Sequence, residues 1–285
     1  MSDEATLSAN SQNNFPSSEV RNTDKSDPIL TISNLVRSFG GLRAVDVDQL
    51  QVQRGIITAF IGPNGAGKTT LFNLITAFDK PDSGSWSFDG LELSDMAPHQ
   101  IAKKGMVRTF QLTKSLAKMT VIDNMLLGAA NQRGESLRNA LIPSTWRQQE
   151  KTILENAENL LERFKISHMR DEYAATLSGG QRKLLEMARA LMSEPKLILL
   201  DEPMAGVNPV LVQSLLQHIQ DLRDEGVSVL FIEHDMDAIM GISDWIVVLA
   251  EGQVIAEGTP ADVSKNPAVI DAYLGSTIAE ELKDV

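Results

Sequence analysis

One octapeptide, Gly62-Pro-Asn-Gly-Ala-Gly-Lys-Thr69, constrains the fold more than any other part of the sequence, because it matches the pattern G-x-x-x-x-G-K-[ST]. It follows an apolar run at 55–61, which predicts a strand, and it precedes residues 70–78, whose apolar positions have helical spacing. A glycine-rich loop of this kind lets backbone N–H groups converge on phosphate oxygens at the N-terminus of the helix. The order of strand, loop and helix predicts a nucleoside triphosphate site.

The parts of this loop have predicted contacts with the nucleotide. The ammonium of Lys68 supplies a positive charge for the β- and γ-phosphates, and the hydroxyl of Thr69 can ligate Mg²⁺. A glycine-rich turn with an exposed lysine is the alternative interpretation, which the flanking strand and helix disfavour. The residues predicted to bind the nucleotide are Gly62, Pro63, Asn64, Gly65, Ala66, Gly67, Lys68, Thr69 and Thr70.

Short apolar strands alternate with helical segments in the second half of the chain. Continuous apolar runs at 196–200, 228–232 and 245–249 predict buried strands, and residues 210–223 predict a helix between two of them. Upstream, residues 152–164 predict an amphipathic helix. Strands that are apolar on both faces belong to a parallel sheet with helices on both sides. The sequence therefore predicts an α/β fold around a parallel sheet.

Composition excludes several classes of protein. The 285 residues contain no cysteine, so disulfides, thiolate catalysis and cysteine-ligated metals are ruled out. Acidic residues outnumber basic ones by 38 to 26, and the net charge of −12 disfavours direct binding to nucleic acid or anionic lipid. No run approaches the ~20 apolar residues of a transmembrane helix, and the polar N-terminus does not resemble a secretory signal. We therefore expect a soluble cytoplasmic protein that reaches a membrane by docking on another protein.

A second constellation is the run Leu197-Ile-Leu-Leu-Asp201-Glu202, in which two carboxylates close an apolar strand. A parallel strand brings Asp201 to the carboxyl edge of the sheet, where ligands of α/β proteins bind, and there it can hold Mg²⁺ through water. Glu202 then lies beside the γ-phosphate and can act as general base on the attacking water. A purely structural role is the alternative, which the phosphate-binding loop disfavours.

A third constellation, Leu177-Ser-Gly-Gly-Gln181, precedes a helical segment at 182–189. Ser178 is placed to cap that helix, whose glycine-rich N-terminus is a second candidate anion site. One nucleotide already has its phosphates bound at 62–69, so the second site needs a second phosphate, most simply from the ATP of another subunit. The residues of this second site are Ser178, Gly179, Gly180 and Gln181.

Together these motifs resemble those of the ATP-binding-cassette (ABC) ATPases. Leu177–Gln181 matches the family signature, and the phosphate loop, the signature and the Asp-Glu strand follow one another in the family's order. The resemblance covers residues 29–275 and implies a P-loop NTPase (RecA-like) parallel sheet core, a small antiparallel β subdomain and an inserted α-helical subdomain at about 112–190. Residues 1–28, rich in Ser, Asn and Asp, are then a disordered polar tail, and 276–285 a C-terminal tail.

The resemblance also implies roles for three further residues. In Arg108-Thr-Phe-Gln111, Gln111 is expected to ligate Mg²⁺ or the attacking water and to couple the nucleotide to a membrane partner; without the resemblance it would be an exposed loop glutamine. His234 follows another apolar strand and is expected to contact the γ-phosphate and orient the water, rather than to be a structural histidine. Phe39 is expected to stack on adenine, with core packing as the alternative.

One position departs from the family pattern. Asn208 stands in the loop that crosses the dimer, where many cassettes have an aspartate, so an amide replaces the usual carboxylate. This variant is similar to the subgroup that serves branched-chain and neutral amino-acid importers. Phe39-Gly-Gly-Leu, Asp271-Ala-Tyr-Leu-Gly275 and the insertion near 131–150 are also similar to that subgroup. The insertion is predicted to be either an exposed segment or a hairpin.

The subgroup's chemistry and partners follow as expectations. Thr69, Gln111 and Asp201 would hold Mg²⁺ while ATP is hydrolysed, with Glu202 as the base and His234 orienting the water. A single phosphate loop and a single signature imply a second ATPase subunit, identical or paralogous. Two integral membrane permeases would hold the pair at the cytoplasmic face of the cell membrane. An extracytoplasmic substrate-binding protein would be an indirect partner, and nucleic acid is not expected as one.

Three alternatives remain open from the sequence. A related cassette for urea uptake or lipid export would have the same ATPase motifs. A soluble cassette protein acting in translation or DNA repair usually carries two cassettes or a long coiled-coil insertion, and this sequence has neither. A small-molecule kinase on a P-loop fold would leave Leu177–Gln181 without a purpose.

Overall fold

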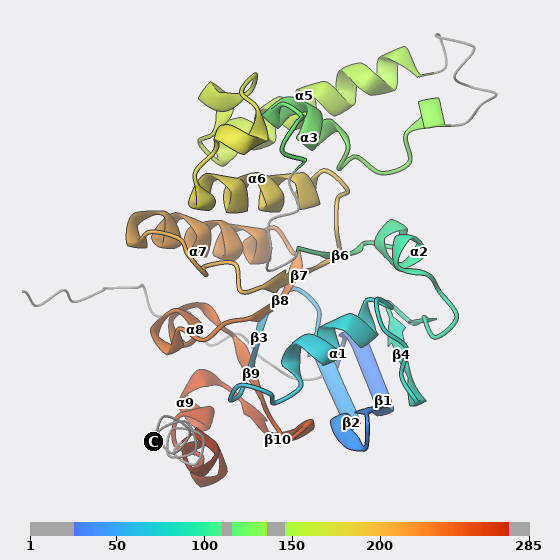
Figure 1. Ribbon diagram of the computed structural model, residues 1–285, viewed down its shortest axis with the longest axis vertical. Coiled ribbons are helices and arrows are strands. Elements are labelled where there is room, and N and C mark those ends of the chain that lie inside the picture. Colours follow the sequence, from blue (N-terminus) through green and yellow to red (C-terminus); the bar gives the residue numbers. More distant parts are fainter. Residues whose placement is uncertain (1–25, 110–115, 136–145, 274–285) are drawn as a thin grey trace, which may run out of the picture.

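The computed structural model describes residues 26–109, 116–135 and 146–273 (Figure 1). Within these ranges the strands are β1 (Pro28–Phe39), β2 (Leu42–Gln53), β3 (Ile57–Ile61), β4 (Ser83–Phe88), β5 (Leu91–Glu92), β6 (Met106–Arg108), β7 (Leu197–Asp201), β8 (Ser228–Ile232), β9 (Trp245–Ala250) and β10 (Gln253–Gly258). The α-helices that can be bounded there are α1 (Lys68–Ile75), α2 (Pro98–Lys103), α3 (Val121–Leu126), α5 (Arg147–Arg163), α6 (Gly179–Leu191), α7 (Pro209–Asp224), α8 (Met236–Ile242) and α9 (Pro260–Val263). Short 3₁₀ turns are η1 (Arg133–Glu135), η3 (Ser167–Met169) and η4 (Ala174–Thr176).

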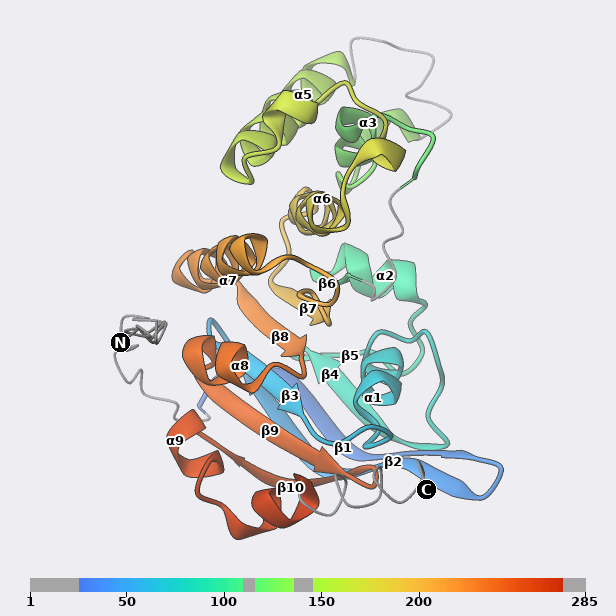
Figure 2. The same cartoon turned by 60° about the vertical axis from the view of Figure 1, so that its left-hand side comes forward.

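The first sheet is antiparallel, and its order in the described residues is β2-β1-β4-β5. β1 and β2 form a long hairpin that pairs Pro28 with Gln53 at one end and Phe39 with Leu42 at the other. Its turn is Gly40–Gly41, whose positive φ angles of 54° and 91° suit residues without a Cβ. Figure 2 shows the tip of this hairpin projecting from the body of the molecule.

The second sheet has the order β10-β9-β3-β8-β7-β6 over the described ranges, and its neighbours are parallel except for β10 and β9. Ile232, at the end of β8, lies opposite Phe60 of β3 and Asp201 of β7. The carboxyl ends of these three strands therefore lie side by side. This is the edge at which α/β proteins bind ligands, and the loops that begin there carry the predicted site.

Apolar layers cover both faces of the parallel sheet. All five residues of β3 are buried, and alternate side chains point to opposite faces. Ile57, Ala59 and Ile61 join a cluster that includes residues of α6, α7 and α8. Phe60 joins a second cluster with residues of β1, β2 and α1, where its ring centroid lies 5.8 Å from that of Phe72. The continuous apolar runs in the sequence are explained by this burial on both faces.

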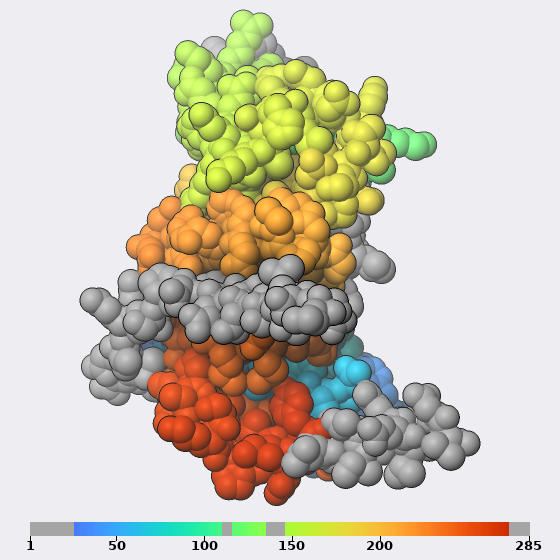
Figure 3. All heavy atoms as spheres, turned by 90° about the vertical axis from the view of Figure 1, so that its left-hand side faces the viewer, coloured from blue at the N-terminus to red at the C-terminus, as the bar shows by residue number. Residues whose placement is uncertain are grey.

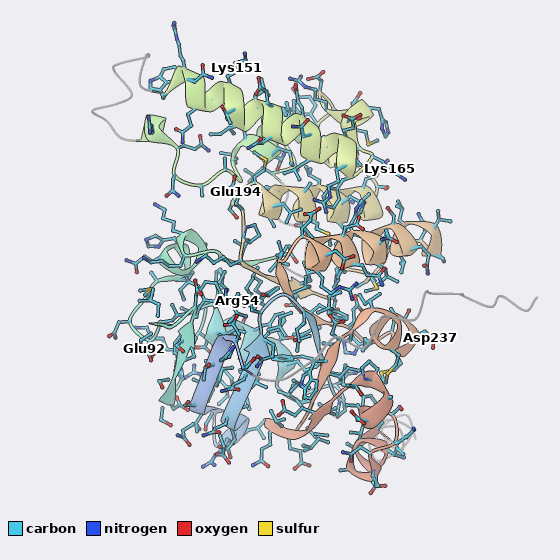
Figure 4. The ribbon with its side chains drawn as sticks, turned by 180° about the vertical axis from the view of Figure 1, so that it is seen from behind. Arg54, Glu92, Lys151, Lys165, Glu194 and Asp237 are labelled. Atoms are coloured by element: carbon cyan, nitrogen blue, oxygen red, sulfur yellow. The ribbon has the colours of Figure 1, made fainter. Side chains whose placement is uncertain are left out.

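Helices α3, α5 and α6 lie together at one end of the molecule, with α7 between them and the parallel sheet (Figures 1 and 3). The predicted amphipathic helix is α5, which begins upstream of the predicted start. Its residues Ala157 and Leu161 are buried, as is Phe164 just beyond it. Lys151 and Lys165, labelled near the two ends of α5 in Figure 4, are exposed. Within the described ranges, no helix combines the length and the apolar character that crossing a membrane requires.

The predicted fold class is confirmed, because a parallel sheet core, an antiparallel sheet and a helical group are all present. The predicted strands at 196–200, 228–232 and 245–249 correspond to β7, β8 and β9. The sequence pattern does not predict β2 or β10, because polar residues interrupt both and neither is buried along its whole length. The boundaries of the helical subdomain stay a prediction. Most of the predicted N-terminal tail, all of the predicted C-terminal tail and part of the predicted insertion lie outside the described residues.

A buried ion pair ties the start of β3 to the end of α7. Asp244 accepts a hydrogen bond from the backbone N–H of Ile57 (2.8 Å) and another from Nη1 of Arg223 (3.2 Å). The side chains of Arg223 and Asp244 are 9% and 4% exposed, so neither charge is well solvated. Nε of Arg223 also pairs with the exposed carboxylate of Asp224 (3.1 Å), so Asp244 is the buried counter-charge of this guanidinium.

We predict that Asp244→Asn lowers the free energy of unfolding by about 2–4 kcal/mol, because it leaves the Arg223 guanidinium without its buried counter-charge. Urea unfolding followed by tryptophan fluorescence measures the change. Asp95→Asn, at an exposed position, is the matched control and should change stability by less than ~0.5 kcal/mol. Equal stability of the two variants would contradict the role given to this pair.

Candidate active site

The predicted phosphate-binding loop directly follows β3 and leads into α1, as the sequence predicts. The ammonium of Lys68, which begins α1, donates to the carbonyl oxygens of Gly62 (2.6 Å) and Pro63 (3.0 Å). Lys68 is only 6% exposed. Burial lowers the pKa of Lys68, whereas the nearby carboxylates of Glu202 and Asp201 raise it. The loop therefore holds a buried positive charge close to two acidic side chains.

Backbone contacts with neighbouring strands fix the path of this loop. A Cβ added at Gly62, where φ is +150°, would lie 2.0 Å from the carbonyl oxygen of Leu249 in β9. A Cβ added at Gly67, where φ is +97°, would lie 2.3 Å from the carbonyl oxygen of Ala44 in β2. Glycine is therefore required at both positions. The loop is in contact with both sheets, and β2 reaches it from the antiparallel one.

Several predicted nucleotide-binding residues are open to solvent. Phe39, at the end of β1, is 48% exposed, and the guanidinium carbon of Arg37 lies 4.6 Å from its ring centroid. Core packing is therefore the wrong interpretation of Phe39. In the phosphate-binding loop, Ala66 is buried, Pro63 and Thr70 are half-buried, and Asn64, Gly65 and Thr69 are exposed.

Asp201 closes β7 and is held by an arginine. Nη2 of Arg108 donates to Oδ2 of Asp201 (2.7 Å), and Nη1 of Arg108 donates to Oδ1 of Asn73 (2.7 Å). The other carboxylate oxygen, Oδ1 of Asp201, is buried and accepts no hydrogen bond from the described residues. A hard cation with oxygen ligands would satisfy it, so the site fits Mg²⁺. No group of three or more His, Cys, Asp or Glu side chains that could hold a metal ion occurs in the described ranges.

Glu202 and His234 meet across the loops that follow β7 and β8. Nε2 of His234 lies 2.9 Å from Oε1 of Glu202, so an imidazole with its proton on Nε2 donates to the carboxylate. Glu202 has a left-handed backbone, with φ of +48°, and its N–H donates to the carbonyl oxygen of Ile232 (3.0 Å). Its own carbonyl oxygen accepts from Nζ of Lys183 in α6 (3.3 Å). Backbone strain of this kind gathers at functional sites.

The third predicted constellation begins α6, and Ser178 caps this helix as predicted. The backbone N–H of Gln181 donates to Oγ of Ser178 (3.3 Å), and the N–H of Ser178 donates to Oε1 of Gln181 (2.8 Å). Gly179 is the first helical residue, and a Cβ added at Gly180 would lie 2.5 Å from a side chain of α7. Asn208, the departure from the family pattern, caps α7.

The structure brings the phosphate-binding loop, Asp201, Glu202 and His234 to one sheet edge. Phe39 lies instead at the end of the β1–β2 hairpin, and residues 178–181 begin α6. Gln111 lies outside the described residues and is not placed. Two residues that the sequence pattern does not single out belong to this edge. Arg108 holds Asp201, and Glu233 is buried and accepts two backbone hydrogen bonds there. In the sequence, only their positions beside predicted site residues could have indicated them: Arg108 stands in the same motif as Gln111, and Glu233 directly precedes His234.

The parallel sheet and the loop after β3 make this a P-loop nucleotide-binding protein. The sequence profile of the ABC transporter family matches residues 45–205, more than half of the chain. A second profile, that of the branched-chain amino acid ATP-binding cassette transporters, matches residues 253–279. The chain therefore belongs to the ABC transporter family, among its ATP-hydrolysing cassettes. The predicted family and the predicted ATPase class are confirmed.

Individual relatives agree with this assignment. The chain is 44% identical over 252 residues to the probable branched-chain amino acid transport ATP-binding protein LivG of Archaeoglobus fulgidus, covering 88% of this chain and 97% of that protein. It is 40% identical to the high-affinity LivG protein of Escherichia coli (strain K12), covering 88% of this chain and 99% of that protein. A solved ABC transporter cassette in its ADP conformation has a TM-score of 0.75 and 40% identity, over 87% of this chain and 99% of that one. Nucleotide binding is thus a property of the family.

Proposed function

We propose that this chain is the ATP-hydrolysing subunit of an importer for branched-chain or neutral amino acids. The observation that carries the proposal is the similarity, over nearly the whole length of the relatives, to proteins named for branched-chain amino acid transport. The profile match at 253–279 supports the same substrate class independently of the ATPase motifs.

The phosphate-binding loop and the carboxylate of Asp201 are proposed to bind ATP and Mg²⁺. Lys68 would exchange its two carbonyl partners for the β- and γ-phosphates, which are stronger acceptors because they are charged. Thr69, Gln111 and Asp201 would hold the metal. For the aspartate this is supported by its buried Oδ1, which accepts no hydrogen bond from the described part of the chain. When bound, Mg²⁺ supplies positive charge that offsets the charge of the phosphates. Phe39, exposed at the end of β1, would stack on the adenine.

Glu202 and His234 are proposed to carry the hydrolysis of ATP to ADP and phosphate. Glu202 would take a proton from the water that attacks the γ-phosphorus, while the bond from phosphorus to the ADP oxygen breaks. His234, already 2.9 Å from Glu202, would orient that water. The Nε2–H that donates to the carboxylate fixes the direction of the carboxylate. This contact is the feature of the structure that most supports an acid–base role.

A second ATPase subunit, identical or paralogous, is proposed to complete each site. The chain has one phosphate-binding loop and one signature, and a single nucleotide would occupy the first of these. The capped N-terminus of α6, with Ser178, Gly179, Gly180 and Gln181, would then bind the phosphates of the ATP held by the partner. Asn208, exposed where it caps α7, would offer an amide to the partner.

A cavity of about 500 Å³ supports docking of membrane permeases. It lies between the parallel sheet core and the helical group, and it is lined by residues of α2, β6 and α6. Thr109, which also lines it, is followed closely by Gln111, the residue expected to couple the nucleotide to the membrane partner. Leu127 lines the cavity and is 56% exposed, so it offers apolar surface to a short helix of the permease. The pair of ATPase subunits would thereby sit at the cytoplasmic face of the membrane, with a substrate-binding protein on the other side.

We predict that Glu202→Gln lowers ATP turnover by ~10²–10⁴-fold, because the amide keeps the shape of the side chain and cannot accept the proton. The variant should still bind ATP and should accumulate as an ATP-dependent dimer, since one of the carboxylates facing the γ-phosphate in each site becomes neutral. Phosphate release and light scattering measure the two effects. The matched control is Glu92→Gln, an exposed residue of β5 labelled in Figure 4, which should keep wild-type turnover. Wild-type turnover by Glu202→Gln would show that Glu202 is not the base.

We predict that Leu127→Asp weakens binding to membranes containing the permeases by about tenfold, because burying a leucine contributes about 1.5–3 kcal/mol. Co-sedimentation with such membranes measures the affinity, and Leu91→Asp, an exposed leucine of β5, is the control. The wild-type chain should ignore anionic liposomes that lack permeases, because its net charge is −12.

The same strains test the substrate. Uptake of labelled leucine, alanine or proline should fall in a strain lacking this chain and return on complementation with the wild-type gene, but not with Leu127→Asp. Unchanged amino-acid uptake in the deletion strain would contradict the substrate class. Binding of the wild-type chain to liposomes without permeases would contradict docking through the cavity.

A further inference from the structure

Glu233 is a buried carboxylate for which the proposed reaction has no use. It stands between Ile232, the last residue of β8, and His234, and it is 5% exposed. Its oxygens accept hydrogen bonds from the backbone N–H of Met204 (2.7 Å) and from the backbone N–H of His234 (3.2 Å). Burial raises the pKa of Glu233, and the two N–H donors act against that rise. A buried carboxylate is costly unless it is hydrogen-bonded. The carboxylate of Glu233 therefore links the loop after β7, which carries Met204, to the loop after β8, which carries His234.

These two loops leave neighbouring strands at the same level of the sheet. β7 and β8 pair with Asp201 opposite Ile232, and the N–H of Glu202 then donates to the carbonyl oxygen of Ile232 (3.0 Å). The imidazole of His234 makes a second link, to the carboxylate of Glu202 (2.9 Å). Glu233 makes a third link, which reaches further along the first loop, to Met204. The loops are therefore connected at successive points rather than at the strand ends alone.

The loop at 203–208 is buried at one end and exposed at the other. Met204 is 7% exposed and belongs to the main apolar cluster, whereas Ala205, Gly206 and Asn208 are exposed. A groove of about 460 Å³ separates the exposed part from the loop that carries His234. In the proposed dimer this exposed part faces the second subunit. Contact with that subunit would therefore act on a segment whose buried end is bonded to Glu233.

We propose that Glu233 is a positioning residue that couples the dimer-facing loop at 203–208 to His234. This role rests on the proposed function of His234. A displacement of the loop by the second subunit is carried from the N–H of Met204 through the carboxylate to the N–H of His234. From there it reaches the imidazole that donates to Glu202. Closure of the dimer thus sets the positions of His234 and Glu202, the two side chains proposed to act on the attacking water.

A carboxylate suits this role better than an amide or an apolar side chain. Both partners are N–H donors, and an ionised carboxylate has two oxygens that accept. Glutamine would place its NH₂ group against one of the donors and lose that bond, while keeping nearly the same volume. An apolar side chain would remove the acceptors of both backbone N–H groups, those of Met204 and His234. Glu233→Gln therefore breaks one side of the link with little change in packing.

The test is a double-mutant cycle on the full-length chain, with Glu233→Gln, His234→Ala and the double variant. Glu233→Gln should lower kcat for ATP by about tenfold, on the scale of one hydrogen bond to a charged group, and leave KM and the dissociation constant of ATP within about twofold. Added to His234→Ala, it should cause no further loss of kcat, because it acts through His234. Asp244→Asn is the matched control, since the carboxylate of Asp244 is also buried and also accepts a hydrogen bond from a backbone N–H. It should lose stability and keep kcat.

Independent, multiplicative losses of kcat in the double variant would overturn the proposal, as would an unchanged kcat in folded Glu233→Gln. An equal loss of kcat in Asp244→Asn would also overturn the proposal, because the loss would then follow from lower stability of the fold rather than from the contact between Glu233 and His234. Wild-type turnover by His234→Ala would contradict the proposed role of His234 itself and is distinguishable because it appears in the single variant. If Glu233→Gln does not fold, the cycle is run with Glu233→Asp, which keeps the charge but is one methylene shorter. The same absence of additivity with His234→Ala is then expected.

Discussion

The ammonium of Lys68 is buried beneath the loop that follows β3 and donates to two carbonyl oxygens of that same loop. A buried cation is costly unless acceptors and negative charge surround it, and the nearby carboxylates of Asp201 and Glu202 provide that charge. This requirement places constraints on the rest of the fold. The strands that carry the carboxylates must end at the same edge of the sheet as β3, and the parallel register of β3, β8 and β7 ensures that they do.

Three carboxylates lie at the same edge, and each is held differently. Arg108 fixes Asp201 by an ion pair, His234 fixes Glu202, and Glu233 is bonded to backbone N–H groups. These differences suit different roles. An aspartate with one buried oxygen that accepts no hydrogen bond from the described residues fits a cation. A glutamate beside an imidazole fits a base, and a buried glutamate bonded to two backbone N–H groups fits a link between loops. Family membership and the similarity to LivG proteins agree with the first two roles.

The sequence was sufficient where the signal is local. The phosphate-binding loop, the apolar runs of β7, β8 and β9, and the cap at Ser178 are each determined by residues a few positions apart, and the structure has them. Contacts between segments far apart in the chain could not be predicted from the sequence. The close approach of Ala44 to Gly67 joins β2 to the loop, and the bond from Met204 to Glu233 spans two loops. Neither contact leaves a periodic or composition pattern, because it depends on the register of strands far apart in the chain.

The most direct measurement of the central claim is the affinity of Lys68→Ala for ATP and for ADP, compared with wild type by calorimetry. Because the ammonium is proposed to exchange its carbonyl partners for the β- and γ-phosphates, its loss should weaken ATP binding by about tenfold or more, and ADP binding by less. Lys80→Ala, which removes an exposed lysine beyond α1, should leave both affinities unchanged. Wild-type affinity for ATP in folded Lys68→Ala would contradict the claim that the buried ammonium organises this site around phosphate.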